Sequence, residues 1–158
     1  MESPTKSNAS TEDSSDGFDD FDLDPRILAA VAALGFESPT PIQVEAIPTL
    51  MAGQNVIGGA RTGSGKTAAF GLPMIHKFRE GGPMRGLVLC PTRELALQVT
   101  EALRSYAKKL PLQITCIYGG ASYEPQFRAL SAGATIVVAT PGRLLDHLQR
   151  GSIDLSML

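Results

Sequence analysis

A glycine-rich stretch in the first half of the chain has the residue types that hold a phosphate chain. It runs Ala60-Arg61-Thr62-Gly63-Ser64-Gly65-Lys66-Thr67. Small residues let backbone N–H groups close around a triphosphate, Lys66 offers a positive charge to the outer phosphates, and the Thr67 hydroxyl suits Mg²⁺. The helical pattern that follows adds the positive end of its dipole. The stretch therefore predicts a phosphate-binding loop, with Lys66 and Thr67 as catalytic residues and Thr67 as the metal contact.

The match to the general phosphate-loop pattern differs at one position, because Ala60 stands where that pattern has glycine. The alternative interpretation is an ordinary turn rich in glycine and serine, with Lys66 in solvent. The apolar pair Val56-Ile57 before the stretch and the helical pattern after it give the strand, loop and helix context of a phosphate site. This context favours the phosphate loop.

Three later loops share a composition suited to binding phosphate groups. They are Pro91-Thr92-Arg93, Gly119-Gly120 and Thr140-Pro141-Gly142-Arg143, and each follows an apolar, strand-like run. Each loop offers backbone N–H donors, a hydroxyl or an arginine at the start of a helix, so the three together could follow a nucleic-acid backbone without reading its bases. For each loop alone, a helix cap with a solvated arginine is the favoured interpretation.

The elements that position these loops alternate between helical and strand-like patterns. Helices are expected after Asp24-Pro25 and after Thr40-Pro41, the second kinked or shortened by Pro48, and over residues 94–110. Strands are expected over residues 55–58, 87–90, 113–117 and 135–139. This order predicts an α/β domain with a parallel sheet, helices on both faces and functional loops at the carboxyl ends of the strands.

Charge is distributed unevenly along the chain. The first 24 residues hold eight acidic side chains against Lys6 alone, which leaves thirteen basic and eight acidic side chains from Pro25 onward. Residues 1–17 are predicted to form a disordered acidic tail, because they are polar and charged and contain few apolar side chains. The basic surplus of the remainder is compatible with a polyanionic partner, although ordinary globular surfaces carry similar surpluses.

Length and apolar content set further limits. A chain of 158 residues with 43% hydrophobic residues is the size of one domain and has enough apolar side chains for a core. It contains neither an uncharged apolar run long enough to span a bilayer nor a signal-peptide pattern, so we expect a cytoplasmic protein without a membrane partner. Cys90 and Cys116 lie in apolar runs and are expected to be buried free thiols.

Five segments resemble, in order, the motifs of the DEAD-box RNA helicases. Residues 35–43, which read Gly-Phe-Glu-Ser-Pro-Thr-Pro-Ile-Gln, resemble that family's Q motif, and Phe18 stands at the aromatic position upstream of it. Residues 60–67 resemble its motif I, in which alanine is the usual first residue. Residues 91–96 resemble motif Ia, Gly119-Gly120 the GG element, and residues 140–143 motif Ib. The resemblance covers residues 18–158 and implies a RecA-like fold.

The resemblance also implies ligands and roles for individual residues. It implies ATP and Mg²⁺ as cofactors, with Gln43 hydrogen-bonded to the adenine edge and Phe18 stacked on the adenine ring. Further cofactor contacts are implied for Arg61, Thr62, Gly63, Ser64, Gly65, Lys66 and Thr67. Contacts to the RNA backbone are implied for Pro91, Thr92, Arg93, Gly119, Gly120, Thr140, Pro141, Gly142 and Arg143. Recognition through the backbone predicts little sequence preference and a strong dependence on salt.

Some parts of the family pattern do not occur in these residues. The tetrapeptide Asp-Glu-Ala-Asp is absent from the sequence, as is a second RecA-like domain. We therefore expect the N-terminal portion of an ATP-dependent RNA helicase, with an incomplete first RecA-like domain, exposed sheet edges and negligible ATP hydrolysis by these residues alone. The alternative is a non-catalytic short form that binds RNA or a partner protein.

Overall fold

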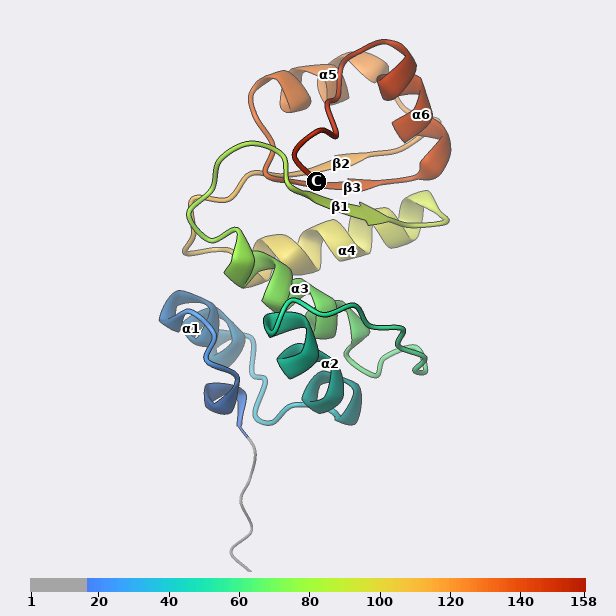
Figure 1. Cartoon of the computed structure of the whole chain (residues 1–158). Coiled ribbons are helices and arrows are strands. Elements are labelled where there is room, and N and C mark those ends of the chain that lie inside the picture. Colours follow the sequence, from blue (N-terminus) through green and yellow to red (C-terminus); the bar gives the residue numbers. More distant parts are fainter. Residues whose placement is uncertain (1–16) are drawn as a thin grey trace, which may run out of the picture.

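The computed structural model describes residues 17–158 and confirms a parallel sheet (Figure 1). Its three strands are β1 (Gly86–Leu89), β2 (Ile114–Ile117) and β3 (Ile136–Ala139), in the order β1-β3-β2. Leu89 of β1 and Ile117 of β2 are both in register with Ala139 of β3. The three strands therefore end at the same level, and the loops that follow them begin side by side.

Helices cover both faces of this sheet. They are a short 3-10 helix, η1 (Phe18–Phe21), and the α-helices α1 (Pro25–Ala33), α2 (Pro41–Met51), α3 (Lys66–Lys77), α4 (Arg93–Tyr106), α5 (Tyr123–Ser131) and α6 (Pro141–Gln149). In Figure 1, α5 and α6 lie on one face, α3 and α4 lie on the other, and α1 and α2 lie farther out. Within residues 17–158, no helix has both the length and the apolar character needed to cross a bilayer. The predicted acidic tail falls almost entirely on residues 1–16, outside the described part.

The central strand shows why two layers of helices are needed. All four residues of β3 are completely buried. Ile136 and Val138 belong to the larger core with α3 and α4, whereas Val137 and Ala139 pack into a smaller core with Leu144 of α6. Successive strand residues point to opposite faces, so an apolar strand such as β3 requires cover on both sides. The predicted α/β class with helices on both faces is confirmed.

The predicted helix starts are also confirmed. Asp24 caps α1, and its carboxylate accepts a hydrogen bond from the Arg26 backbone N–H at 2.9 Å. The Arg26 guanidinium beside this carboxylate holds the pKa of Asp24 well below its usual range. The helix α2 continues past Pro48 to Met51, so the alternative that this proline shortens the helix is wrong, and the alternative of a kink stays a prediction. Cys90 is buried and Cys116 half-buried, and both are free thiols.

The strand expected over residues 55–58 is not formed, which corrects the sequence interpretation. Ile57 is fully exposed, and Val56 is also exposed. Within residues 17–158 no strand lies beside this segment, and β1 pairs only with β3. Backbone N–H and C=O groups of an extended segment form a strand only when a neighbour pairs with them. The apolar residues alone were therefore an insufficient signal, and Leu89 is left exposed at the open edge of β1.

Lowering the pH from about 7.5 to about 5.5 is expected to destabilise the fold through two histidines. Burial lowers the pKa of His76 and of His147, and the Nδ1 atom of His76 accepts a hydrogen bond from the Asp24 backbone N–H at 3.0 Å. The charged groups near His76 are Arg79 and Asp24, and those near His147 are Arg143, Asp146 and Arg150. Below its ordinary pKa each histidine binds a proton more readily in the unfolded chain, so acid favours unfolding.

The measurement is a series of thermal melts across this interval, which lies above the range where carboxylates titrate. Each histidine contributes at most about 1.4 kcal/mol of lost stability per pH unit, and the contribution is complete above its ordinary pKa near 6.5. Replacing His76 with glutamine should reduce the slope. A melting temperature that stays constant over the interval contradicts the prediction.

Candidate nucleotide loop and nucleic-acid interface

The predicted phosphate loop closes on itself just before α3. Gly63 and Gly65 have φ values of 79° and 86°, in the left-handed region that favours glycine. Lys66 is the first residue of α3, and its Nζ donates a hydrogen bond to the Ala60 carbonyl at 2.6 Å. Thr67 is half-buried in the first helical turn, whereas Arg61 and Thr62 are exposed. The loop therefore presents the lysine, the threonine and the start of a helix together.

Two residues at the start of α2 hold the shape of this loop. The Thr40 hydroxyl donates to the Ser64 carbonyl at 2.7 Å, and the Gln43 Nε2 donates to the Gly65 carbonyl at 3.0 Å. The Gln43 Oε1 in turn accepts from the Thr40 backbone N–H at 3.0 Å. Gln43 is only 3% exposed, so its amide sits inside the structure rather than on an open helix surface.

The space beside these contacts suits a nucleotide. A cavity of about 370 Å³, within the usual size of small-molecule sites, is lined by Thr40, Pro41, Ile42, Glu45, Gly59, Ala60 and Ser64. Among the described residues, the Ser64 hydroxyl is buried next to it without a hydrogen-bond partner. Within residues 17–158, the Lys66 ammonium is held by one backbone carbonyl, which a phosphate can replace. These residues fit a bound ATP with Mg²⁺ at Thr67.

Phe18 lies in an aromatic cluster rather than in this cavity. Its ring is 7% exposed and packs edge-on against Phe21, with centroids 6.0 Å apart. The Phe36 ring, from the Q-motif segment, packs on it at 6.1 Å and contacts Tyr106 of α4 at the same separation. Stacking of adenine on Phe18 stays a prediction, and it requires the Phe18 ring to become accessible.

The three other predicted loops meet at one edge of the sheet. The Cys90 backbone N–H donates to the Ala139 carbonyl at 2.9 Å, and the Thr140 N–H donates to the Ile117 carbonyl at 3.0 Å. These bonds align the loops immediately after the strands. The exposed residues that they bring to the edge are Pro91, Thr92, Arg93, Gly119, Gly120, Pro141 and Gly142, and Thr140 is half-buried beside them. In Figure 1 this edge and the phosphate loop both lie toward the right of the view.

Arg93 is presented to solvent in this edge. Its guanidinium carbon lies 4.7 Å from the centroid of the Tyr118 ring, so the arginine of one loop is held over the aromatic residue that precedes the next. Thr92 caps α4, because its hydroxyl oxygen accepts from the Leu95 backbone N–H at 3.2 Å. The hydroxyl hydrogen of Thr92 is not used in that bond and can be donated to an anion.

Arg143 differs from Arg93, because its side chain is only 13% exposed. Its Nη1 donates to the Gln126 Oε1 at 3.1 Å, and its Nη2 donates to the Ala121 carbonyl at 2.9 Å. The Asp146 carboxylate lies 3.8 Å from its Nε. Sequence reasoning missed Gln126 and the bond from Thr40 to the phosphate loop, because polar residues in helical patterns carry no signal of their tertiary partners.

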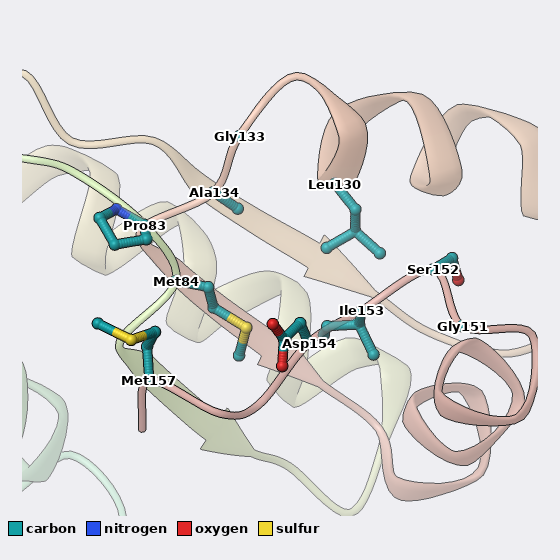
Figure 2. A pocket seen from close by; sticks show the side chains of 10 residues that line it. All are labelled: Pro83, Met84, Leu130, Gly133, Ala134, Gly151, Ser152, Ile153, Asp154 and Met157. Carbon is teal, nitrogen blue, oxygen red and sulfur yellow. The ribbon is translucent and has the colours of Figure 1, made fainter.

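A second cavity lies away from all these residues. Figure 2 shows the residues that line it, which come from the segment before β1, the end of α5, the segment before β3 and the segment after α6. The cavity measures about 310 Å³, and its lining is mainly apolar, including Met84, Leu130, Ile153 and Met157. No residue predicted to bind nucleotide or RNA lines it.

Comparisons with known proteins agree with this geometry. The DEAD/DEAH box helicase family model matches residues 40–158. The chain is 52% identical over 141 residues to the ATP-dependent RNA helicase DeaD of Mycobacterium tuberculosis, covering 88% of this chain and 25% of that protein. It is 52% identical over 143 residues to the DeaD protein of Escherichia coli, covering 89% of this chain and 23% of that protein.

Solved structures show the same fold. A DEAD box protein from Methanococcus jannaschii matches with a TM-score of 0.85 and 43% identity, over 90% of this chain and 39% of that one. A hypothetical ATP-dependent RNA helicase from Sulfolobus tokodaii matches with a TM-score of 0.80 and 40% identity, over 86% of this chain and 39% of that one. The chain spans about a quarter of the length of the curated relatives it matches. With its RecA-like fold and a family match over most of its length, the chain belongs to the DEAD/DEAH box helicases.

Proposed function

We propose that the chain binds ATP with Mg²⁺ and the backbone of single-stranded RNA. In the whole protein it serves as the N-terminal portion of an ATP-dependent RNA helicase, which couples ATP hydrolysis to unwinding of RNA duplexes or remodelling of RNA–protein complexes. The observation that carries this proposal is the phosphate loop held by Thr40 and Gln43, on the side of the domain where three loops end the sheet strands. The names of the DeaD relatives support it.

Gln43 is the proposed reader of the adenine base. A side-chain amide has two donor hydrogens and two acceptor lone pairs, and the bonds to Gly65 and Thr40 use one of each. The remaining donor and acceptor complement the edge of adenine, which offers one acceptor and one donor. The same pair does not match guanine, so this residue is the proposed source of selectivity for ATP over GTP.

The phosphates are proposed to bind at residues 61–67. Backbone N–H groups of the loop and the start of α3 face the anion, and Lys66 exchanges its bond with the Ala60 carbonyl for one with phosphate. Thr67 holds Mg²⁺ through its hydroxyl, and the ion, when bound, offsets the negative charge of the triphosphate. These residues bind and orient the nucleotide.

ATP hydrolysis by the chain alone is expected to be negligible, with or without RNA. Phosphoryl transfer depends on placing charge around the transferred phosphate, and the sequence contains no Asp-Glu-Ala-Asp carboxylates to hold the metal and water. Release of inorganic phosphate is measured with purified chain, ATP and Mg²⁺. RNA-stimulated release that disappears in Lys66→Ala contradicts this prediction.

RNA binding is expected to weaken when Arg93 is replaced with alanine. The exposed guanidinium over Tyr118 is positioned to contact a phosphate, and each such contact contributes about 0.7 to the slope of log affinity against log salt for a single strand. Fluorescence anisotropy with short oligouridine at several salt concentrations measures both effects. Arg128→Ala is the matched control, because Arg128 is an exposed arginine on α5 paired with Glu124. Equal affinities and slopes for the two variants contradict the assignment of Arg93.

A further inference from the structure

We propose that Arg143 is a positioning residue that fastens the turn after β2 to the start of α6, and that it does not itself bind an RNA phosphate. In this role it holds the turn at residues 119–122 and the loop at residues 140–142 as one surface for the RNA backbone. The inference rests on the proposed RNA-binding function of this edge. It assigns different roles to Arg143 and Arg93, which the sequence presents in similar loops.

The guanidinium of Arg143 is hydrogen-bonded through both of its Nη atoms. Nη1 and Nη2 donate to Gln126 and to the Ala121 carbonyl, and Nε lies near Asp146. An arginine binds phosphate most strongly through two parallel N–H groups along one edge of its fork. Each edge of this fork already has an N–H that donates to Gln126 or to the Ala121 carbonyl. The side chain is also only 13% exposed. Arg93, by contrast, is exposed and contacts the Tyr118 ring through the face of its guanidinium.

Gln126 completes a two-point attachment of the turn. Its Nε2 donates to the Tyr118 carbonyl at 3.0 Å, while its Oε1 accepts from Arg143. The turn that contains Gly119 and Gly120 is therefore held by Gln126 before the two glycines and by Arg143 after them. Gly120 has a φ of 74° and open space around it, so the turn gains little rigidity from its own packing. Arg143 and Gln126 supply the contacts that fix it.

Behind this pair, His147 lies next to the amide of Gln126. His147 is completely buried, and its Nε2 lies 3.5 Å from the Gln126 Oε1. Its Nδ1 lies 2.7 Å from the Ser152 hydroxyl, and the Tyr123 ring stacks on it with centroids 4.5 Å apart. A neutral imidazole that donates from Nε2 favours the amide orientation with Oε1 toward Arg143. The pKa of His147 is lowered by burial, which favours this neutral form.

The test compares Arg143→Lys, Arg143→Ala, Gln126→Ala and the double variant Arg143→Ala/Gln126→Ala in the full chain. Oligouridine affinity is measured against salt, with Arg128→Ala as the surface control. Lysine keeps the charge but cannot reach two acceptors, so we expect both Arg143 variants and Gln126→Ala to lose affinity about tenfold with an unchanged salt slope. The double variant should lose no more than either single variant, because both act through one attachment. Thermal melts confirm that each variant is folded.

Three results would overturn the proposal: near-normal affinity in Arg143→Lys, a reduced salt slope in Arg143→Ala, or a neutral Gln126→Ala. A readout without RNA separates this proposal from the proposed function. Backbone amide resonances of residues 119–122 should shift in Arg143→Lys and in Gln126→Ala but stay unchanged in Arg93→Ala. If the unmodified chain fails to bind oligouridine at low salt, the RNA function is wrong. The amide shifts then decide the positioning role, and unchanged resonances in both variants overturn it.

Discussion

Replacing Lys66 with alanine is expected to weaken ATP binding by about 10- to 100-fold, because a charge-assisted hydrogen bond to phosphate is lost. Lys66 begins α3 and has its ammonium on the Ala60 carbonyl, directly over the loop that would hold the phosphates. Arg61 is the other basic residue among residues 60–67, and it precedes α3. Isothermal titration with ATP and Mg²⁺ measures the change.

Lys77→Ala is the matched control for this experiment. Lys77 is the last residue of the same helix, so the two substitutions remove the same side chain from opposite ends of α3. The Lys77 variant should bind ATP with normal affinity. Similar affinities for the two variants, or a loss in Lys66→Ala that coincides with unfolding in a thermal melt, would argue against a direct phosphate contact.

Replacing Gly65 with alanine is expected to cause the largest structural effect in the loop. Its φ of 86° disfavours any side chain, and an added Cβ would collide with the Nε2 of Gln43 and lie 2.9 Å from the Thr40 hydroxyl. The substitution therefore breaks the contacts from α2 to the loop and adds backbone strain of about 1 to 3 kcal/mol. We expect loss of measurable ATP binding together with a lower melting temperature.

Gly119→Ala provides the control, because Gly119 lies outside the nucleotide cavity and outside the left-handed region and has open space where the Cβ would go. This variant should retain both stability and nucleotide affinity. If Gly65→Ala binds ATP as tightly as Gly119→Ala does, the hydrogen bonds from Thr40 and Gln43 do not determine the shape of the phosphate loop.

Local signals in the sequence were sufficient for much of the fold. The runs that became β1, β2 and β3 are apolar, and caps such as Asp24 act within a few residues, so each is readable from nearby residues. The run at residues 55–58 has similar composition but remained without strand structure, because pairing requires a neighbour far away in the sequence. Whether a strand finds a partner elsewhere in the chain therefore cannot be predicted from the composition of the run itself.

In the candidate site, too, local features could be predicted from the sequence and tertiary contacts could not. The phosphate loop is recognisable from its glycines and Lys66, whereas Gln43 would be interpreted from composition as an exposed helical residue. Arg93 and Arg143 follow similar strands, yet one is exposed and the other is enclosed by Gln126 and Ala121. The two arginines differ because Arg143 bonds to Gln126 of α5, which lies 17 residues earlier in the chain. The residues next to Arg143 in the sequence do not indicate this partner.

The bonds from α2 to the loop carbonyls link two parts of nucleotide recognition that are often considered separately. Gln43 is the proposed reader of the base, and it holds the Gly65 carbonyl of the phosphate loop while Thr40 holds the Ser64 carbonyl. A change in Gln43 is therefore expected to alter base preference and phosphate affinity together, as a coupling free energy between the two ends of one ligand. Under the proposed function, we expect that redesign of base selectivity at Gln43 would also change the affinity for the triphosphate.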